Sequence, residues 1–190
     1  GGGGVNELDA MQQFTCESKF ELIPTKYLFN SPKEINESLK EKNRLALTMT
    51  GVIERNLDDT KGLQSSNYSG YQIFSENDLV FKLIDLENVK TSRVGYVNKR
   101  GIMSPAYIRL SHIKERVYPK YYYWFFYAAY LNNIFNALGD GIRQNMSSND
   151  LLCTSVPNIP ITKQQSIANY LDRETTPVSY THLTLPTMIG

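Results

Sequence analysis

Three consecutive side chains late in the sequence could read the edges of DNA bases. They are Arg143, Gln144 and Asn145, which follow two glycines in the stretch GDGIRQN. Arginine pairs with guanine edges, and glutamine and asparagine with adenine edges, through bidentate hydrogen bonds. The neighbouring glycines carry no Cβ atom and allow close approach of the backbone. A turn between two helices, whose polar side chains face water, is the alternative interpretation, and both stay open on these residues alone.

A second candidate for base contacts is the turn in the stretch RLALTMTGVIER. Leu45 and Leu47 alternate with smaller or polar residues, which is the period of a half-buried strand, and the chain is expected to turn at Gly51. Thr50 and Arg55 lie on either side of this turn. We assign both side chains to the predicted base-reading surface.

Phosphate contacts are expected from a basic segment at residues 82–120. The whole sequence is nearly neutral, with 20 Lys and Arg against 19 Asp and Glu, but this segment has nine basic residues and three acidic ones. Local clustering matters more than total charge for binding a polyanion, and irregular spacing suits a track along phosphates better than a base code. The predicted phosphate contacts are Lys82, Lys90, Arg93, Lys99 and Arg100. A solvated charged face is the alternative.

No catalytic motif accompanies these residues. The sequence has no His, Cys and Asp cluster at metal-ligand spacing, no phosphate-binding glycine loop and no nucleophile elbow. His112 is expected at the end of a basic strand, and Asp58 and Asp59 in a polar turn. A nuclease that uses these two aspartates with Asp85 is the enzymatic alternative. The pattern as a whole favours a recognition module.

Composition favours a soluble, cytoplasmic protein. Hydrophobic residues make up 41% of the chain, and no apolar run reaches the roughly 18 residues that a membrane span needs. There is no basic-then-apolar leader. Cys16 and Cys153 lie far apart and form no CxxC pair, so we expect free thiols in a reducing compartment and no membrane partner.

Five or so short strands without long helices between them predict an α+β fold with a mixed or antiparallel sheet. Residues 1–19 lack a core pattern and are expected to be a flexible lead-in. The expected strand regions are 20–29, 44–55, 71–86, 92–98 and 106–111. A polar turn at 76–78 divides the third region, and the stretch KRGIMSP, residues 99–105, is expected to be a connection.

Helical spacing of apolar residues predicts a helix from Pro119 to Leu138, with Gly139 as its C-cap. Its aromatic side chains recur at core spacing, so we expect packing rather than a platform for stacking bases. Ser147 or Ser148 is expected to cap a short helical turn that follows.

The next helix is expected to start at a capping box formed by Thr162 and Gln165. Apolar residues then recur at the spacing of a coiled-coil seam. A helix this short is marginal in water without a partner, so it is expected to be a truncated coiled-coil-type helix. The seam residues are Ile161, Ile167, Ala168 and Leu171.

The last residues are expected to be foreign to the fold. The stretch VSYTHLTLPT, residues 178–187, back-translates to a string similar to the transposon-end adapter used in sequencing libraries. We therefore interpret residues 176–190 as an adapter-derived tail that takes no part in the expected fold.

Several motifs together resemble one known family, the specificity subunits of type I restriction–modification enzymes. The similarity runs from about Phe20 to Thr175 and includes LALTMTGVIERN, NDLVFKLIDLENVKTSRVGYVNKRGIMSPAYIRL and GDGIRQNMSSNDLLCTSVPNIPITKQQSIANYLDRET. Its most specific part is the proline segment, the Gln-Gln pair and IANYLD. These resemble the junction where a target-recognition domain passes into the family's spacer helix.

The resemblance implies a non-catalytic DNA target-recognition domain at 20–158 and the start of the conserved spacer helix at 159–175. A full subunit has two such domains, each of which reads half of a bipartite site in double-stranded DNA, separated by paired helices. Methyltransferase subunits would bring S-adenosylmethionine, and a restriction subunit would bring ATP and Mg²⁺, so no cofactor is expected on this chain. The alternative is a scaffold module that binds only other subunits.

Overall fold

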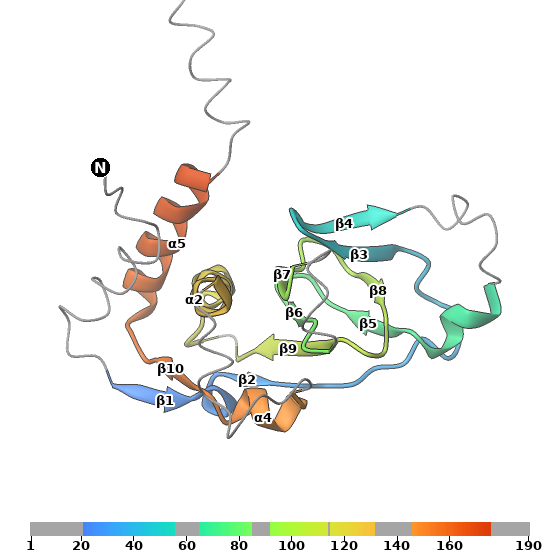
Figure 1. The fold of residues 1–190 in the computed structure, drawn as a ribbon, viewed down its shortest axis with the longest axis horizontal. Helices are drawn as coiled ribbons and strands as arrows, with labels where there is room; N and C mark the ends of the chain where they lie inside the picture. The colour runs from blue at the N-terminus through green and yellow to red at the C-terminus, as the bar shows by residue number, and fades with distance from the viewer. Residues whose placement is uncertain (1–20, 56–64, 85–91, 114, 132–145, 176–190) are drawn as a thin grey trace, which may run out of the picture.

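A computed structural model describes residues 21–55, 65–84, 92–113, 115–131 and 146–175 of the chain. These ranges contain two four-stranded sheets, a two-stranded ribbon and three α-helices (Figure 1). A 3-10 helix, η3 (Ser65–Gly70), precedes β5. The predicted α+β class is confirmed.

The first sheet has the strand order β2-β9-β6-β7 and is antiparallel throughout. The central strand β6 is wholly apolar, and Leu79 and Phe81 of β6 and Leu110 of β9 are fully buried. His112 ends β9, as expected. The strands are β2 (Phe29–Asn30), β6 (Leu79–Phe81), β7 (Val94–Tyr96) and β9 (Ile108–His112).

The second sheet has the order β4-β3-β8-β5 and is mixed, because β3 pairs with β8 in parallel and the other pairs are antiparallel. The alternation predicted for the β3–β4 hairpin is confirmed, since Leu45 and Leu47 are buried. Gly51 has a φ of 125°, which places the turn where the sequence predicted it. The strands are β3 (Arg44–Thr48), β4 (Gly51–Arg55), β5 (Gln72–Phe74) and β8 (Gly101–Met103).

The expectation that KRGIMSP is only a connection was wrong. Its residues Gly101–Met103 form β8, an inner strand of the second sheet. Ile102 and Met103 are each 1% exposed, so their burial outweighs the turn-forming tendency of the flanking glycine and proline.

The two consecutive strands β5 and β6 belong to different sheets. The predicted polar turn between them carries the chain from one sheet to the other, and Asn77 has a left-handed φ of 72° there. The sheets come close together at Gly95, where an added Cβ would lie 2.6 Å from Leu47 Cδ1 and 2.8 Å from Val52 Cγ2. β7 of the first sheet therefore packs directly on the β3–β4 hairpin.

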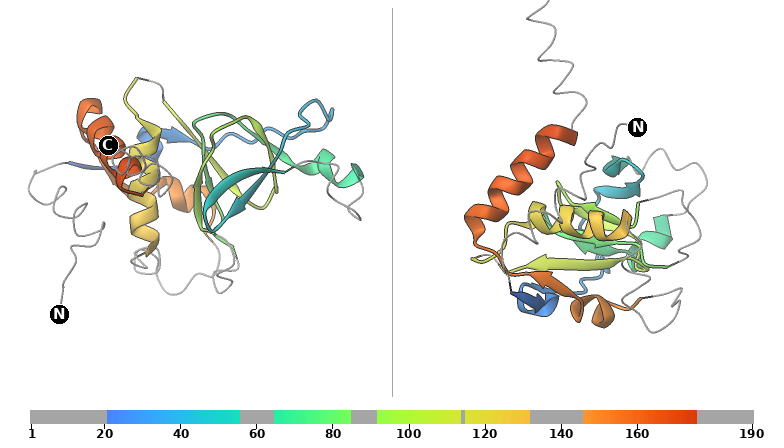
Figure 2. Two further views of the ribbon diagram at one scale, coloured as in Figure 1. Left: turned by 90° about the horizontal axis from the view of Figure 1, so that it is seen from above. Right: turned by 60° about the vertical axis from the view of Figure 1, so that its left-hand side comes forward.

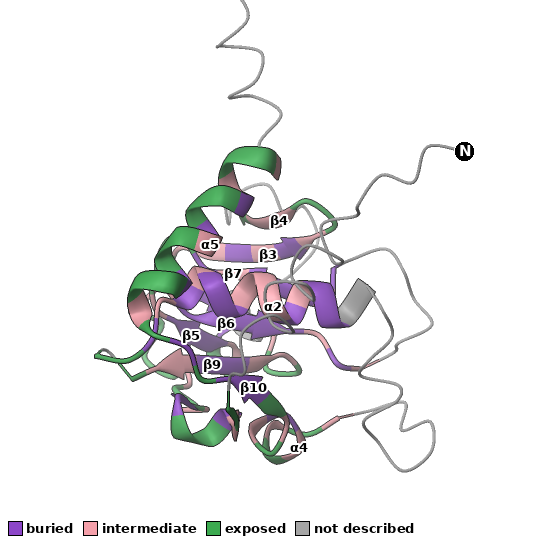
Figure 3. Ribbon diagram, turned by 90° about the vertical axis from the view of Figure 1, so that its left-hand side faces the viewer, coloured by how far each residue is buried: buried purple, intermediate pink, exposed green. Residues whose placement is uncertain are grey.

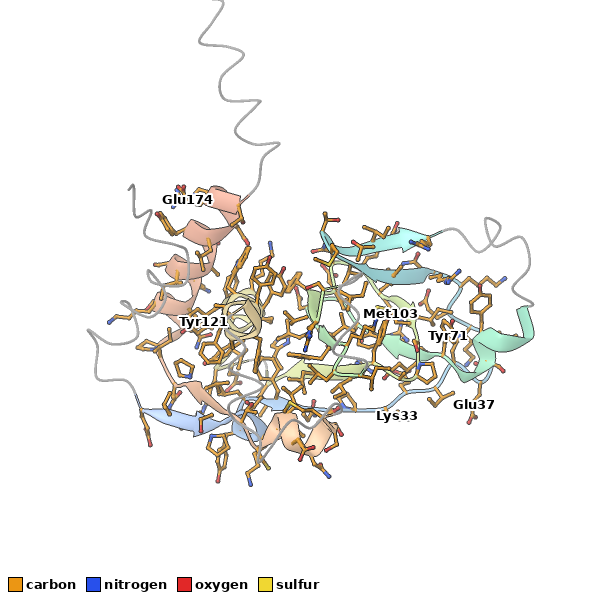
Figure 4. All side chains as sticks on the ribbon, viewed as in Figure 1. Lys33, Glu37, Tyr71, Met103, Tyr121 and Glu174 are labelled. Atoms are coloured by element: carbon orange, nitrogen blue, oxygen red, sulfur yellow. The ribbon has the colours of Figure 1, made fainter. Side chains whose placement is uncertain are left out.

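Helix α2 (Pro119–Leu131) supplies the aromatic part of the core. Tyr122 packs edge-on against Phe29, and Phe126 against Phe81, with ring centroids 5.5 and 5.0 Å apart. Aromatic packing, rather than an open stacking platform, is therefore confirmed for these residues. The predicted continuation to Leu138 and the Gly139 cap lie outside the described residues. Figure 4 shows Tyr121 and Met103 in the two separate parts of the hydrophobic interior.

Helix α4 (Ser148–Leu152) has the cap that the sequence predicted. The Ser147 hydroxyl accepts a hydrogen bond from the Asp150 amide, and the Asp150 carboxylate accepts one from the Ser147 amide. After α4, β10 (Ser155–Pro157) pairs antiparallel with β1 (Leu22–Pro24). The predicted 20–29 strand is thus two strands, with the 3-10 helix η1 (Thr25–Tyr27) between them.

Helix α5 (Ile161–Thr175) lies beside α2, and α2 lies between α5 and the first sheet (Figures 1 and 2). The predicted capping box was wrong, because the helix begins one residue before Thr162. Figure 3 shows one buried face along α5 and an exposed opposite face. The predicted seam residues Ala168 and Leu171 are buried, but the next buried position towards the N-terminus is Gln164.

Candidate nucleic-acid interface

The turn of the β3–β4 hairpin is an exposed polar tip. The Thr48 hydroxyl donates to the Gly51 carbonyl at 2.8 Å, and it accepts a hydrogen bond from the Thr50 amide at 3.2 Å. These bonds satisfy backbone groups within the turn. The Thr50 hydroxyl lies 3.1 Å from the Thr48 hydroxyl, and the Thr50 side chain is exposed at the tip of the turn.

Two predicted phosphate contacts lie beside this turn. The Lys82 amide donates to the Arg93 carbonyl at 2.8 Å, so the two residues are neighbours just beyond β6 and β7. The Ser92 amide in turn donates to the Thr48 carbonyl of the hairpin at 3.4 Å. Lys82, Arg93 and Thr50, which are far apart in the sequence, therefore share one end of the molecule.

Two further segments begin or end at the same place. The Met146 amide donates to the Leu83 carbonyl at 3.2 Å. Met146 directly follows the GDGIRQN stretch, and Leu83 and Ser92 flank the segment that contains Lys90. The remaining predicted site residues, Lys90, Arg143, Gln144 and Asn145, lie outside the described residues.

The other predicted basic contacts lie at the opposite end of the hairpin. Arg55 pairs with Arg44 at the far end of the β3–β4 ladder, about 14 Å from the turn at the usual rise per residue. Lys99 forms an ion pair with Glu54 at 3.1 Å, and Arg100 is paired in the same region.

Ion pairing weakens this second group as a phosphate surface. Arg100 lies 3.2 Å from Glu41 and 3.6 Å from Glu34, and its side chain is half exposed. Each carboxylate offsets positive charge that a polyanion would otherwise meet. The structure therefore separates Lys99, Arg100 and Arg55 from the hairpin turn in position, and it holds Lys99 and Arg100 in ion pairs with glutamates.

Arg109 belongs to the interior rather than to the basic surface. Its Nε donates to Asp78 Oδ2 at 2.6 Å and its Nη2 donates to Ser75 Oγ at 3.0 Å, while Ser111 Oγ donates to Asp78 Oδ1 at 2.7 Å. Arg109 is 7% exposed and sits at the switch between the two sheets. One of the nine positive charges in the basic segment is thus structural.

The aromatic face around α2 is held in its neutral form. Burial raises the pKa of Tyr96 to about 12, with smaller contributions from Tyr118, Glu76 and Asp172, and burial likewise raises the pKa of Tyr123 to about 12. Their hydroxyls stay protonated at physiological pH. The Tyr96 hydroxyl donates a hydrogen bond to the Asn77 side chain.

The described residues contain no group of three or more His, Cys, Asp or Glu that could hold a metal ion. Over the same ranges, no helix is long and apolar enough to span a membrane. Cys153 is a free and exposed thiol, as expected, and Cys16 lies outside these ranges. The enzymatic alternative relied on Asp58, Asp59 and Asp85, which the structure does not describe either.

No protein-family model and no curated protein sequence matches this chain. Solved structures do match it, and three of them come from type I restriction–modification systems. The HsdS subunit from Thermoanaerobacter tengcongensis has a TM-score of 0.51 at 9% identity, and the type I S subunit from M. genitalium has 0.51 at 12%. A structure on complex assembly and conformational transition of the type I R-M system has 0.56 at 11%.

These similarities define the fold. The chain has the fold of a type I restriction–modification specificity subunit, and the aligned region covers 94–97% of it. The same alignments cover only 46–47% of the matched structures, so the chain spans about half the length of those proteins.

Proposed function

We propose that residues 20–158 are a sequence-specific DNA target-recognition domain and that residues 159–175 begin the spacer helix of a type I specificity subunit. The observation that carries this proposal is the fold similarity to three such structures over 94–97% of the chain. In this role the chain is non-catalytic and acts in the cytoplasm.

The hairpin turn is the centre of the proposed reading end. Thr50 and the stretch with Arg143, Gln144 and Asn145 would contact bases, because these side chains offer the required donors and acceptors. Support comes from the hydrogen bonds that bring Met146 and Ser92 to this end. The adjoining phosphate contacts in this proposal are Lys82, Lys90 and Arg93.

Arg55, Lys99 and Arg100 would contribute weaker contacts from the far end of the hairpin. The ion pairs of Lys99 and Arg100 with glutamates must be exchanged for phosphate contacts, which reduces the net gain in binding. We assign all three to backbone positioning rather than to base reading.

In the proposed enzyme, the partners bring the chemistry. Methyltransferase subunits would supply S-adenosylmethionine-dependent methylation, and a restriction subunit would supply ATP- and Mg²⁺-dependent translocation and cleavage. The chain itself would direct both to one half of a bipartite DNA site.

Charge-removal variants test the proposed surface on an assembled enzyme with methyltransferase subunits. Lys82→Ala with Arg93→Ala should weaken binding on every duplex and reduce the salt dependence by about one unit per lost phosphate contact. The matched control is Lys33→Ala with Lys40→Ala, two exposed lysines outside the proposed surface; Figure 4 shows Lys33 at the lower edge. Equal losses for the two double variants would reject the surface, and no DNA binding by the assembled enzyme would favour the scaffold alternative.

A further inference from the structure

Gln164 joins the start of α5 to the start of α2 through backbone groups alone. Its Oε1 accepts from the Tyr118 amide at 2.7 Å, and its Nε2 donates to the carbonyls of Arg116 at 3.0 Å and Ile159 at 2.9 Å. The side chain is fully buried. Tyr118 immediately precedes Pro119, the first residue of α2, so Gln164 holds the entrance of that helix.

A second contact ties α5 to α2 farther along both helices. Asp172 accepts from Lys120 Nζ at 2.9 Å and from Trp124 Nε1 at 2.9 Å. Asp172 lies eight residues after Gln164, or about 12 Å along the helix axis. Two polar contacts at this separation restrain both translation and rotation of α5 relative to α2. A single contact would leave α5 free to rotate about it.

The apolar residues of α5 between the two polar contacts pack closely, but they do not fix the direction of the helix axis. Ala168 is fully buried and Leu171 is 3% exposed on the same face of α5. Apolar contacts of this kind are non-directional and tolerate small rotations. The Gln164 amide is different, because any rotation that breaks its bonds leaves its own buried side chain and the Ile159 carbonyl without partners, which is costly.

We propose that Gln164 is a positioning residue that fixes the direction in which α5 leaves the recognition domain. The Asp172 contact with Lys120, whose side chains are 30% and 34% exposed, is the more solvated of the two polar contacts and would hold that direction less firmly. The functional consequence rests on the proposed function. If α5 begins the spacer helix, Gln164 sets the orientation of the recognition domain, and therefore of its DNA half-site, relative to the rest of the subunit.

The chain offers a reporter and a matched control for this inference. Trp124 is its sole tryptophan, and it contacts α5 through Asp172 rather than through Gln164. Gln164→Leu removes the buried hydrogen bonds at similar volume, and Gln165→Leu makes the same change at an exposed neighbour. If Gln164 positions α5, only Gln164→Leu moves the Trp124 emission to longer wavelength and raises its quenching by acrylamide, while far-ultraviolet circular dichroism still shows a folded domain.

An unchanged Trp124 signal in a folded Gln164→Leu protein would overturn the inference, as would equal changes in both variants. Should Gln164→Leu fail to fold, hydrogen exchange on the wild-type protein decides. The Tyr118 amide should exchange roughly tenfold or more slowly than an exposed amide, because Gln164 is its acceptor, and fast exchange would contradict the role. Neither measurement uses DNA, so failure here is distinct from failure of the proposed function.

Discussion

Replacing Arg109 by methionine should destabilise the domain strongly. The guanidinium is nearly buried, and it is bonded to Asp78, whose side chain is 4% exposed. Methionine has a similar length and no charge. After Arg109→Met, the Asp78 carboxylate keeps hydrogen bonds from the Ser75 amide and the Ser111 hydroxyl, at 2.7 Å each, but has lost the buried cation beside it.

The magnitude follows from that uncompensated charge. Removal of one partner from a buried ion pair costs about 3–5 kcal/mol, whereas a surface pair contributes about 0–1 kcal/mol. Arg100→Met is the matched control, because Arg100 belongs to the same basic segment and its ion pairs are half exposed. The double variant Arg109→Met with Asp78→Asn should recover part of the loss, since no unpaired buried charge remains.

Urea unfolding of the four proteins measures these differences in the free energy of unfolding. Arg109→Met should show the largest loss, and Arg100→Met should lie close to wild type. Equal losses in the two single variants, or a double variant less stable than Arg109→Met alone, would contradict this pairing. Either result would mean that Arg109 is not paired in the interior as described.

Other predictions concern base reading and the tyrosines. Gln144→Ala or Asn145→Ala should cost about 1–3 kcal/mol on the cognate site and little on scrambled DNA; a uniform loss in a binding titration would make the stretch a phosphate clamp. The Tyr121 hydroxyl is buried without a partner among the described residues, whereas Tyr122 donates to the Pro157 carbonyl at 2.7 Å. Tyr121→Phe should therefore be neutral or stabilising and Tyr122→Phe should cost about 1–2 kcal/mol in thermal unfolding, and the reverse order would contradict these contacts. Burial raises the pKa of Tyr121 to about 12, so this hydroxyl does not affect the pH dependence of stability below pH 10, and the fold loses stability as the pH rises from 10 towards 12. The last rise in the absorbance of ionised tyrosine should coincide with unfolding between pH 10 and 12. Ionisation of every tyrosine in a protein that is still folded would contradict the burial of Tyr121.

Local patterns could be predicted from the sequence because their partners are close along the chain. The Ser147–Asp150 capping box and the β3–β4 hairpin both depend on residues within a few positions of each other. By contrast, β8 was missed because its pairing partners lie in β3 and β5, while its own stretch contains turn-forming Gly and Pro.

The roles of individual charged and polar residues depended on distant partners. Arg109 and Arg100 have the same sequence context of a basic segment, but only Arg109 meets the buried Asp78, 31 residues away. Gln164 bonds to backbone groups near residue 118, which leave no signature in the side chains of the sequence. Tertiary contacts of this kind decide which members of a basic or polar run can face a ligand.

The most direct test of the account is the ratio of affinities for cognate and scrambled DNA. The chain, assembled with type I methyltransferase subunits, would be used to select bound duplexes from a random pool, and the selected and scrambled duplexes would be titrated at one fixed salt concentration. The account predicts an enriched half-site and a preference of roughly 10³-fold or more, while the chain alone binds weakly at about 10⁻⁴–10⁻⁶ M. Equal affinity of the assembled enzyme for both duplexes, with no enriched sequence, would contradict a recognition role for this domain.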